Sequence, residues 1–302
     1  MLFIHPRLAT WVRIATLALL WGSGFLLIKM ALEGFTPYQI VLAQLALGAV
    51  VLLGFMFATK GRVPRDRITW LHLGVAALLA NIVPYLLFAI AEQDIDSAVA
   101  GVINTTTPLF TVIVAVMVGH ESRPGRTRLI GLLVGIAGTI VLLSPWKSGT
   151  QFTSWGAVAA LVASLSYAVS YVYMDRFLVS RRLSPLTLAA SQLLAATGIT
   201  ALALPATRDW TVPVWHLDAT LSLVALGILS TGIAYVLNYR IITDDGASAA
   251  SVVTYLLPVT ALILGAIVLD ETPTLHAIIG MLIILAGVAL ARRGVVPRHA
   301  QS

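Results

Sequence analysis

Aromatic and amide side chains are the residues of this sequence whose types and spacing could bind a ligand. Trp21 and Phe25 are four residues apart, as are Tyr167 and Tyr171, so each pair lies on one face of a helix. Further aromatic, amide and hydroxyl groups occur within other apolar stretches: Asn81, Tyr85, Asn104, Thr105, Tyr235, Thr254 and Tyr255. Aromatic surface with a few such polar groups suits a small amphipathic or aromatic ligand. The alternative interpretation is core packing for Phe25 and an interfacial position for some tyrosines.

The residues that catalysis needs are missing from the apolar stretches. The chain has no cysteine, and its histidines lie at or outside the ends of these stretches without metal-ligand spacing. The acidic residues Glu33, Glu92, Asp175 and Asp270 lie close to an end. Lys29 also lies near an end, and its amine can reach outward along the helix. We therefore expect no catalytic residue, no metal, no cofactor and no enzyme.

Composition indicates that the apolar stretches lie in lipid. Of 302 residues, 59% are hydrophobic and 11% are charged, whereas soluble proteins have about 25% charged residues. The net charge of +6 could indicate nucleic acid, but the cations lie in short segments between apolar stretches. We therefore expect a lipid bilayer and a small molecule as partners, and no nucleic acid. The first apolar stretch is long enough to span, so we interpret it as a retained helix rather than a signal peptide.

Ten stretches contain the roughly 20 mostly apolar residues that a helix needs to cross a bilayer. They lie at about 14–33, 38–58, 70–91, 96–119, 127–145, 154–174, 185–204, 217–240, 247–269 and 274–291. With the N-terminus inside, every Lys and Arg except Lys29, Lys147 and Arg208 falls on the cytoplasmic side. This asymmetry predicts a multi-pass protein of the bacterial cytoplasmic (inner) membrane with both termini in the cytoplasm.

The second half of the chain repeats the first at an offset near 150 residues. The segment Ser97–Glu121 recurs as Ala247–Glu271, with a proline at the twelfth position of each copy. Matches at similar offsets pair Gln44 with Gln192, Tyr85 with Tyr235, Gly131 with Gly280 and Gly138 with Gly287. Because five helices per half is an odd number, the second copy enters the membrane from the opposite side. The sequence predicts an all-α integral membrane protein of ten transmembrane helices in two inverted-topology repeats, 1–146 and 152–292, with a cytoplasmic tail, 293–302.

Three prolines lie within apolar stretches: Pro84, Pro108 and Pro258. Each removes a backbone donor and frees a carbonyl about one turn earlier. They could act as hinges that gate a cavity, or they could only kink packed helices.

Three glycines, Gly131, Gly135 and Gly138, share a helix face that permits close helix contact. We interpret this face as packing within one protomer, with a dimer seam as the alternative. The expected assembly is a monomer or a weak homodimer.

The sequence resembles the drug/metabolite transporter superfamily, in its EamA-type branch. The residues that carry the resemblance are Leu20-Trp21-Gly22, Thr36-Pro37, and the series Pro108, Glu121, Gly131, Gly138 with its copy Pro258, Glu271, Gly280, Gly287. The resemblance implies a carrier that exports amino acids, related metabolites or drugs. It also implies a central cavity lined by helices one, three, four, six, eight and nine. Tyr167 departs from the tryptophan that this family often has in the second half.

The expected function is a secondary transporter that exports a small neutral or zwitterionic metabolite, such as an amino acid or a related compound, by alternating access. One alternative is a proton-coupled multidrug efflux pump, and another is a membrane-embedded enzyme. The pump is disfavoured because proton relays commonly use a buried carboxylate, and the sequence has none deep within a predicted helix.

Overall fold

Helices form all the regular secondary structure of the described residues. The computed structural model describes residues 6–95, 97–120, 125–143, 154–207, 211–268 and 275–293. The elements of the first half are α1 (Pro6–Gly22), α2 (Gly24–Ala31), α3 (Pro37–Ala58), α4 (Arg67–Ala77), η1 (Leu78–Ile82), α5 (Val83–Asp94), α6 (Ser97–Asn104), α7 (Thr107–Met117) and α8 (Arg126–Leu143). The second half contains α9 (Trp155–Tyr173), η4 (Met174–Leu178), η5 (Val179–Arg181), α10 (Pro185–Thr207), α11 (Leu217–Ala225), η6 (Leu226–Ile233), α12 (Ala234–Asp245), α13 (Ala247–Ser251), η7 (Val252–Leu256), α14 (Leu257–Val268) and α15 (Leu275–Arg293). The repeat glutamates Glu121 and Glu271, and residues 294–302 of the predicted tail, lie outside the described residues.

Helices long and apolar enough to span a membrane dominate the described chain. Seven meet this description: Thr10–Ala31, Pro37–Ala58, Arg67–Asp94, Val99–Met117, Trp155–Arg181, Pro185–Pro205 and Leu217–Asp245. Two shorter apolar helices cover Ala247–Thr260 and Ile278–Ala291. All nine coincide with predicted spans, and the remaining predicted stretch, at 127–145, coincides with α8. An all-helical membrane protein is confirmed, and the count of ten crossings stays a prediction.

The two proline-bearing copies of the repeat both depart from α-helical geometry just before the proline. The first copy is interrupted at Thr105 and Thr106, between α6 and α7, and each hydroxyl donates to the carbonyl three residues earlier. The second copy tightens into the 3₁₀ turn η7 before Pro258. Because proline lacks an N–H, the preceding turn cannot complete its hydrogen bonds and changes pitch instead. Both copies therefore change helical geometry before the proline, and a hinge at these prolines stays a prediction.

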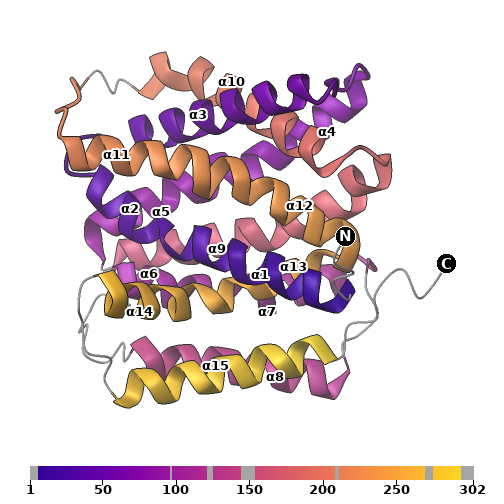
Figure 1. Ribbon diagram of the computed structural model, residues 1–302, viewed down its shortest axis with the longest axis vertical. Coiled ribbons are helices and arrows are strands. Elements are labelled where there is room, and N and C mark those ends of the chain that lie inside the picture. Colours follow the sequence, from indigo (N-terminus) through magenta and orange to yellow (C-terminus); the bar gives the residue numbers. More distant parts are fainter. Residues whose placement is uncertain are drawn as a thin grey trace.

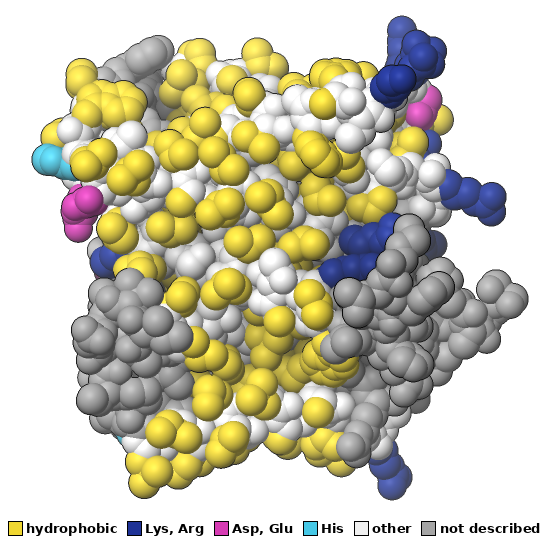
Figure 2. All heavy atoms as spheres, in the orientation of Figure 1, with side chains coloured by type: hydrophobic (Ala, Val, Ile, Leu, Met, Phe, Trp, Pro, Cys, Tyr) yellow, Lys and Arg dark blue, Asp and Glu magenta, His cyan; other side chains and the backbone are white. Residues whose placement is uncertain are grey.

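The helices lie side by side, with α3, α4 and α10 on one flank and the pair α8 and α15 on the other (Figure 1). The start of α1 and the end of α15 lie at the same end of the bundle (Figure 1). Figure 2 shows hydrophobic side chains across the middle of the visible face, while Lys and Arg gather along the edge where α1 begins. Exposed apolar side chains at the centre and charges at the edge are what a lipid-facing surface requires.

Glycines hold α8 and α15 in backbone contact. A Cβ atom added to Gly131 would lie 2.3 Å from the Ala291 nitrogen, and one added to Gly138 would lie 2.6 Å from the Ile284 nitrogen. A Cβ added to Gly287 would lie 2.5 Å from the Gly135 nitrogen. These distances leave no room for a side chain, so the glycine face packs within the protomer. The alternative of a dimer seam on this face is wrong.

Candidate functional site

A cavity lies at the centre of the bundle, between elements from both halves of the chain. The space between its walls, counted together with the open solvent at its mouth, is about 680 Å³. Its walls are Trp21 of α1, Gly24, Phe25 and Ile28 of α2, Gln44 of α3, Tyr85 and Phe88 of α5, Asn104 of α6, Tyr167 and Tyr171 of α9, Leu226, Ser230 and Thr231 of η6, Tyr235 of α12, Thr254 of η7 and Leu257 of α14. The walls are thus aromatic and aliphatic, with a few neutral polar groups.

The structure brings most of the predicted site residues to this cavity. Eight of them line it: Trp21, Phe25, Tyr85, Asn104, Tyr167, Tyr171, Tyr235 and Thr254. Three predicted residues, Asn81, Thr105 and Tyr255, do not line it. Tyr255 instead donates a hydrogen bond to the Leu132 carbonyl at 2.8 Å, with its ring against Gly135 of α8. The predicted hinge residues Pro84, Pro108 and Pro258 are buried and do not line the cavity either.

Aromatic rings contact one another around the cavity. Trp21 meets Tyr235 edge to face, with ring centroids 6.4 Å apart. Phe88 lies between Phe25, at 5.6 Å, and Tyr167, at 6.0 Å. Edge-to-face and offset pairs are the favoured arrangements of aromatic rings. The rings therefore support one another, and their remaining surface faces the cavity.

Two π-helical turns lie at equivalent places in the two halves, and η6 lines the cavity whereas η1 contacts a residue of its wall. The turn η1 covers Leu78–Ile82, and η6 covers Leu226–Ile233, which includes the positions 150 residues later. A π turn inserts an extra residue, frees carbonyls from the helix ladder and is frequent at functional sites. The Ala80 carbonyl accepts from the Tyr235 hydroxyl at 2.5 Å, and the Ser230 carbonyl accepts from the Trp21 indole at 3.1 Å. The turns thus orient two cavity aromatics.

Buried amides join helices of opposite halves. Gln192 of α10 donates to Asn81 Oδ1 at 2.7 Å and accepts from the Tyr239 hydroxyl. In the other half, Gln44 of α3 accepts from the Thr231 hydroxyl at 3.4 Å. Thr231 stands 150 residues after Asn81, and Gln192 stands 148 after Gln44. The two glutamine contacts therefore occupy matched positions in the two halves.

Sequence reasoning missed several cavity residues. Gln44 served only as a marker of the repeat, and Phe88, Ser230 and Thr231 were not considered for the site. The signal was present for Thr231, because it matches Asn81 across the repeat. Phe88 could have been found as well, since it lies one helical turn after Pro84 and three residues after Tyr85.

No charged side chain lines the cavity within the described chain. Ion pairs lie instead toward the end of the bundle where α1 begins. Arg13 of α1 pairs with Asp244 of α12 at 2.5 Å, and His120, after α7, contacts Asp175 of η4 at 3.0 Å. Asp175 also accepts from the backbone N–H of Ala247, the first residue of α13. These contacts tie segments of the two halves together. The cavity itself therefore offers a neutral surface.

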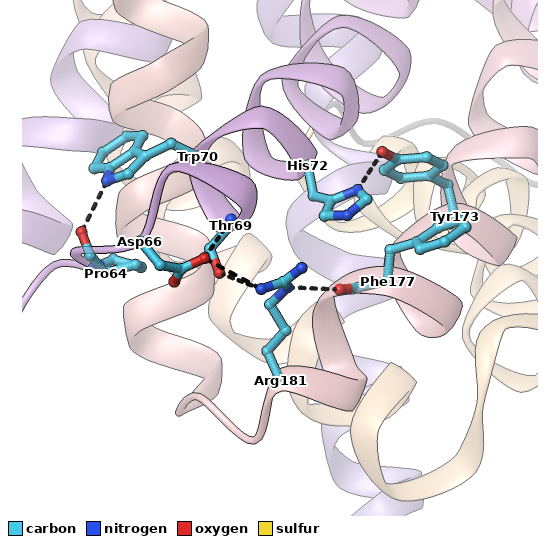
Figure 3. Close-up of polar contacts among 8 residues, drawn as sticks. All are labelled: Pro64, Asp66, Thr69, Trp70, His72, Tyr173, Phe177 and Arg181. Carbon is cyan, nitrogen blue, oxygen red and sulfur yellow. Dashed lines mark hydrogen bonds and ion pairs between the residues drawn. The ribbon is translucent and has the colours of Figure 1, made fainter.

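A second group of polar contacts connects α4 and the residues just before it to the end of α9 and to η4 and η5 (Figure 3). Asp66 accepts from the Thr69 N–H and pairs with Arg181 Nη1 at 3.2 Å (Figure 3). Hydrogen bonds from Thr69, helped by the positive charge of Arg181, lower the pKa of the Asp66 carboxyl. His72 contacts the Tyr173 hydroxyl at 2.6 Å. This cluster lies outside the cavity and connects the halves at their periphery.

Glu92 and Asp175 lie near helix ends as predicted, yet both are almost fully buried. Glu92 is 0% exposed and Asp175 is 4% exposed. Glu92 lies one turn after Phe88 on α5, and its carbonyl accepts from the Lys29 amine at 3.0 Å. Lys29 therefore contacts backbone near a helix end, and neither it nor Glu92 lines the cavity.

Comparisons with known proteins agree with a transporter. Residues 10–144 and 154–293 match the EamA-like transporter family. The chain is 28% identical to the uncharacterized transporter YdfC of Bacillus subtilis, over 89% of this chain and 86% of the relative. It is 26% identical to the uncharacterized inner membrane transporter YedA of Escherichia coli, over 82% and 79%. One crystal structure shares the fold with a TM-score of 0.77 at 23% identity, and the likeness covers 97% of this chain and 99% of the other.

Proposed function

The chain belongs to the EamA-like transporter family of the drug/metabolite transporter superfamily, and we propose that it is a secondary carrier for a small neutral or zwitterionic metabolite. The carrier works by alternating access, and the central cavity is its substrate site. The inner membrane relative and the apolar helices support a place in a bacterial inner membrane. Export is the proposed direction.

The observation that carries this proposal is the composition of the cavity wall. Both matched segments, 10–144 and 154–293, contribute residues to it. A site between two halves near the centre of the bundle can be exposed first to one side and then to the other when the halves rock. A neutral aromatic wall holds an amphipathic molecule without holding an ion too tightly to release. No carboxylate is among the described lining residues, so a proton-coupled multidrug pump would have to use a buried carboxylate behind the wall, such as Glu92 or Asp175.

We further propose the ten-helix inverted repeat, with halves at 1–146 and 152–292. The matched π turns and the matched glutamine contacts support it, because two copies of one five-helix unit would place such features in pairs. Lys and Arg gather at the end of the bundle where α1 begins, which supports cytoplasmic termini (Figure 2).

We further propose that the proline-bearing segments and the ion pairs together gate the cavity. The segments before Pro108 and Pro258 can bend at low cost, because the first is interrupted and the second has left the α-helical hydrogen-bond pattern for a 3₁₀ turn. The contacts Arg13–Asp244 and His120–Asp175 close the cytoplasmic end, and they separate when the cavity opens to that side.

Flux through purified protein in liposomes tests the proposal. Radiolabelled amino acids and small aromatic metabolites are offered to proteoliposomes, with empty liposomes as the blank. Substrate-dependent flux is expected, and it should fall in Trp21→Ala and Asn104→Ala while both variants reconstitute normally. Folded protein without flux of any compound would contradict the carrier, and full flux in both variants would contradict the site.

A further inference from the structure

Several hydrogen-bond donors of the cavity wall already donate to other groups of the protein. Trp21 donates to the Ser230 carbonyl and Tyr235 to the Ala80 carbonyl. The hydroxyl of Ser230 donates to the Leu20 carbonyl at 2.7 Å, and that of Thr254 donates to the Ser251 carbonyl at 2.9 Å. Since each of these groups has one proton to donate, none can offer a further strong hydrogen bond to a ligand.

Two side-chain amides differ from these groups. Asn104 Oδ1 accepts from the Thr107 hydroxyl at 3.1 Å, and Gln44 Oε1 accepts from the Thr231 hydroxyl at 3.4 Å. In both cases the amide oxygen accepts a hydrogen bond from a threonine hydroxyl of the protein. Neither amide nitrogen forms a hydrogen bond to a described residue, and neither nitrogen is fully buried. Because both residues line the cavity, we take their N–H groups to face it.

The repeat supplies an internal comparison. Gln192, the match of Gln44, is fully buried, and its nitrogen donates to Asn81. Gln192 therefore uses its amide to hold helices together, whereas Gln44 keeps its N–H groups for the cavity. The same residue type at matched positions performs a structural task in one half and faces the ligand in the other.

From these contacts we infer that, of the neutral and zwitterionic classes, the cavity selects uncharged ligands that carry a hydrogen-bond acceptor, and that the amide nitrogens of Gln44 and Asn104 donate to this acceptor. The inference rests on the proposed function and names the substrate class of that site. The aromatic wall takes the apolar body of the ligand, and the two amides donate to a carbonyl or a similar oxygen. A ligand with an ammonium group would find no carboxylate among the lining residues. A purely hydrocarbon ligand would leave the amide N–H groups of Gln44 and Asn104 without an acceptor. The hydroxyls of Tyr85, Tyr167 and Tyr171 can donate as well as accept, so they are compatible with such a ligand.

Three indole probes test the inference on purified protein in detergent. Indole-3-acetamide, tryptamine and 3-ethylindole share a ring and chain length and end in a carboxamide, an ammonium and a methyl group. Melting temperature is measured against probe concentration, because a ligand that binds the folded state raises it. The carboxamide should bind about tenfold more tightly than either other probe, the difference expected for one well-formed hydrogen bond.

Variants assign the preference to residues. In Gln44→Leu and Asn104→Leu the carboxamide should lose its advantage over 3-ethylindole. In Gln44→Glu the preference should move to tryptamine, because a carboxylate now faces the ligand. Gln192→Leu, measured under conditions where it remains folded, removes a matched amide outside the cavity and should keep the preference for the carboxamide.

Equal binding of the three probes, a preference for tryptamine, or an unchanged preference in Gln44→Leu and Asn104→Leu would overturn the inference. So would the absence of a temperature shift with all three probes. Liposome flux of another compound would in that case leave the carrier function standing, whereas probe binding without flux would contradict the carrier alone.

Discussion

The side chain of Gln192 donates a hydrogen bond to Asn81 Oδ1 at 2.7 Å, and both residues are 0% exposed. The contact joins α10 to the π turn η1, so it links the second half of the chain to an element beside the cavity. The Tyr239 hydroxyl donates to the oxygen of the same amide. One glutamine thus satisfies partners on two helices besides its own.

Replacing Gln192 by leucine should destabilise the protein. The change removes the hydrogen-bond partner of Asn81 and of Tyr239, and each buried polar group left unpaired costs about 1–3 kcal/mol. The melting temperature of the purified variant should fall by several degrees. Gln44→Leu is the matched control, and it should melt near the wild-type temperature because Gln44 makes a single long hydrogen bond. Equal melting of wild type and Gln192→Leu would show that the buried network is not stabilising.

Tyr255→Phe should leave transport intact although Tyr255 was a predicted site residue. Its hydroxyl donates a hydrogen bond to the Leu132 carbonyl, and Tyr255 does not line the cavity. Loss of this hydrogen bond should cost about 1 kcal/mol of stability. Trp21→Ala should reduce flux about tenfold or more, because removing an aromatic wall costs more than ~1.4 kcal/mol of binding. Flux of an identified substrate in proteoliposomes compares the two, and a large loss of flux in Tyr255→Phe would contradict the assigned cavity wall.

Gly287→Ala should separate α8 from α15. The added Cβ would lie 2.5 Å from the Gly135 nitrogen, which is backbone and cannot rotate away. Overpacking of this kind costs about 1–3 kcal/mol. Gly198→Ala in α10 is the control, because a Cβ at Gly198 meets nothing within 4 Å. Melting temperature should fall in the first variant and stay constant or rise in the second. A similar melting temperature in both variants would mean that the close backbone contact between α8 and α15 does not stabilise the protein.

Asp175→Asn should loosen the end of the bundle where α1 begins, which we propose to be cytoplasmic. The change weakens the contact to His120 and the cap on Ala247, which together hold η4, α7 and α13. Because the chain contains no cysteine, a single Ser248→Cys substitution reports on this end without background. Ser248 is 2% exposed, so a maleimide should label the cysteine slowly in the otherwise wild-type protein and faster with Asp175→Asn. As the control, Arg62→Cys, at an exposed position between two spanning helices, should label equally in both backgrounds. Unchanged labelling of Ser248→Cys would argue against this contact as a gate.

The pairing of Asp66 with Thr69 and Arg181 predicts a pH dependence at low pH. The folded-state pKa of this carboxyl is lowered, so the carboxylate stabilises the fold at pH values above the unfolded pKa of about 3.9. This contribution is lost as the pH falls through the folded pKa. Asp66→Asn should therefore melt slightly below the wild type at pH 6, and the difference should vanish under strongly acidic conditions. A difference that is constant with pH would show that the charge of Asp66 does not contribute.

Periodicity explains why much of the cavity could be predicted from residues alone. Trp21 with Phe25, and Tyr167 with Tyr171, share helix faces because residues four apart lie one above the other. Both pairs do line the cavity. Hydropathy likewise predicts where helices run, because a backbone in lipid must satisfy its hydrogen bonds internally.

The misplaced residues lie where the helices depart from α geometry. Tyr255 is in the 3₁₀ turn η7, which has 3.0 residues per turn, and its side chain therefore points to α8 rather than to the cavity. Asn81 is in the π turn η1, and its amide oxygen accepts from Gln192. A change of pitch rotates every later side chain, and composition does not reveal where the pitch changes.

The sequence by itself determined that the chain is helical, lies in a membrane, repeats at an offset near 150 residues and keeps charges out of its centre. Each of these properties follows from residue types and their spacing along the chain. The tertiary structure decided which of two matched glutamines faces the cavity, because that depends on the partner each side chain meets on another helix. The amide nitrogen of Gln192 donates to Asn81. Gln44, in contrast, only accepts a hydrogen bond from Thr231 at its amide oxygen. A hydroxyl in place of an amide at one matched position leaves a donor free for the ligand.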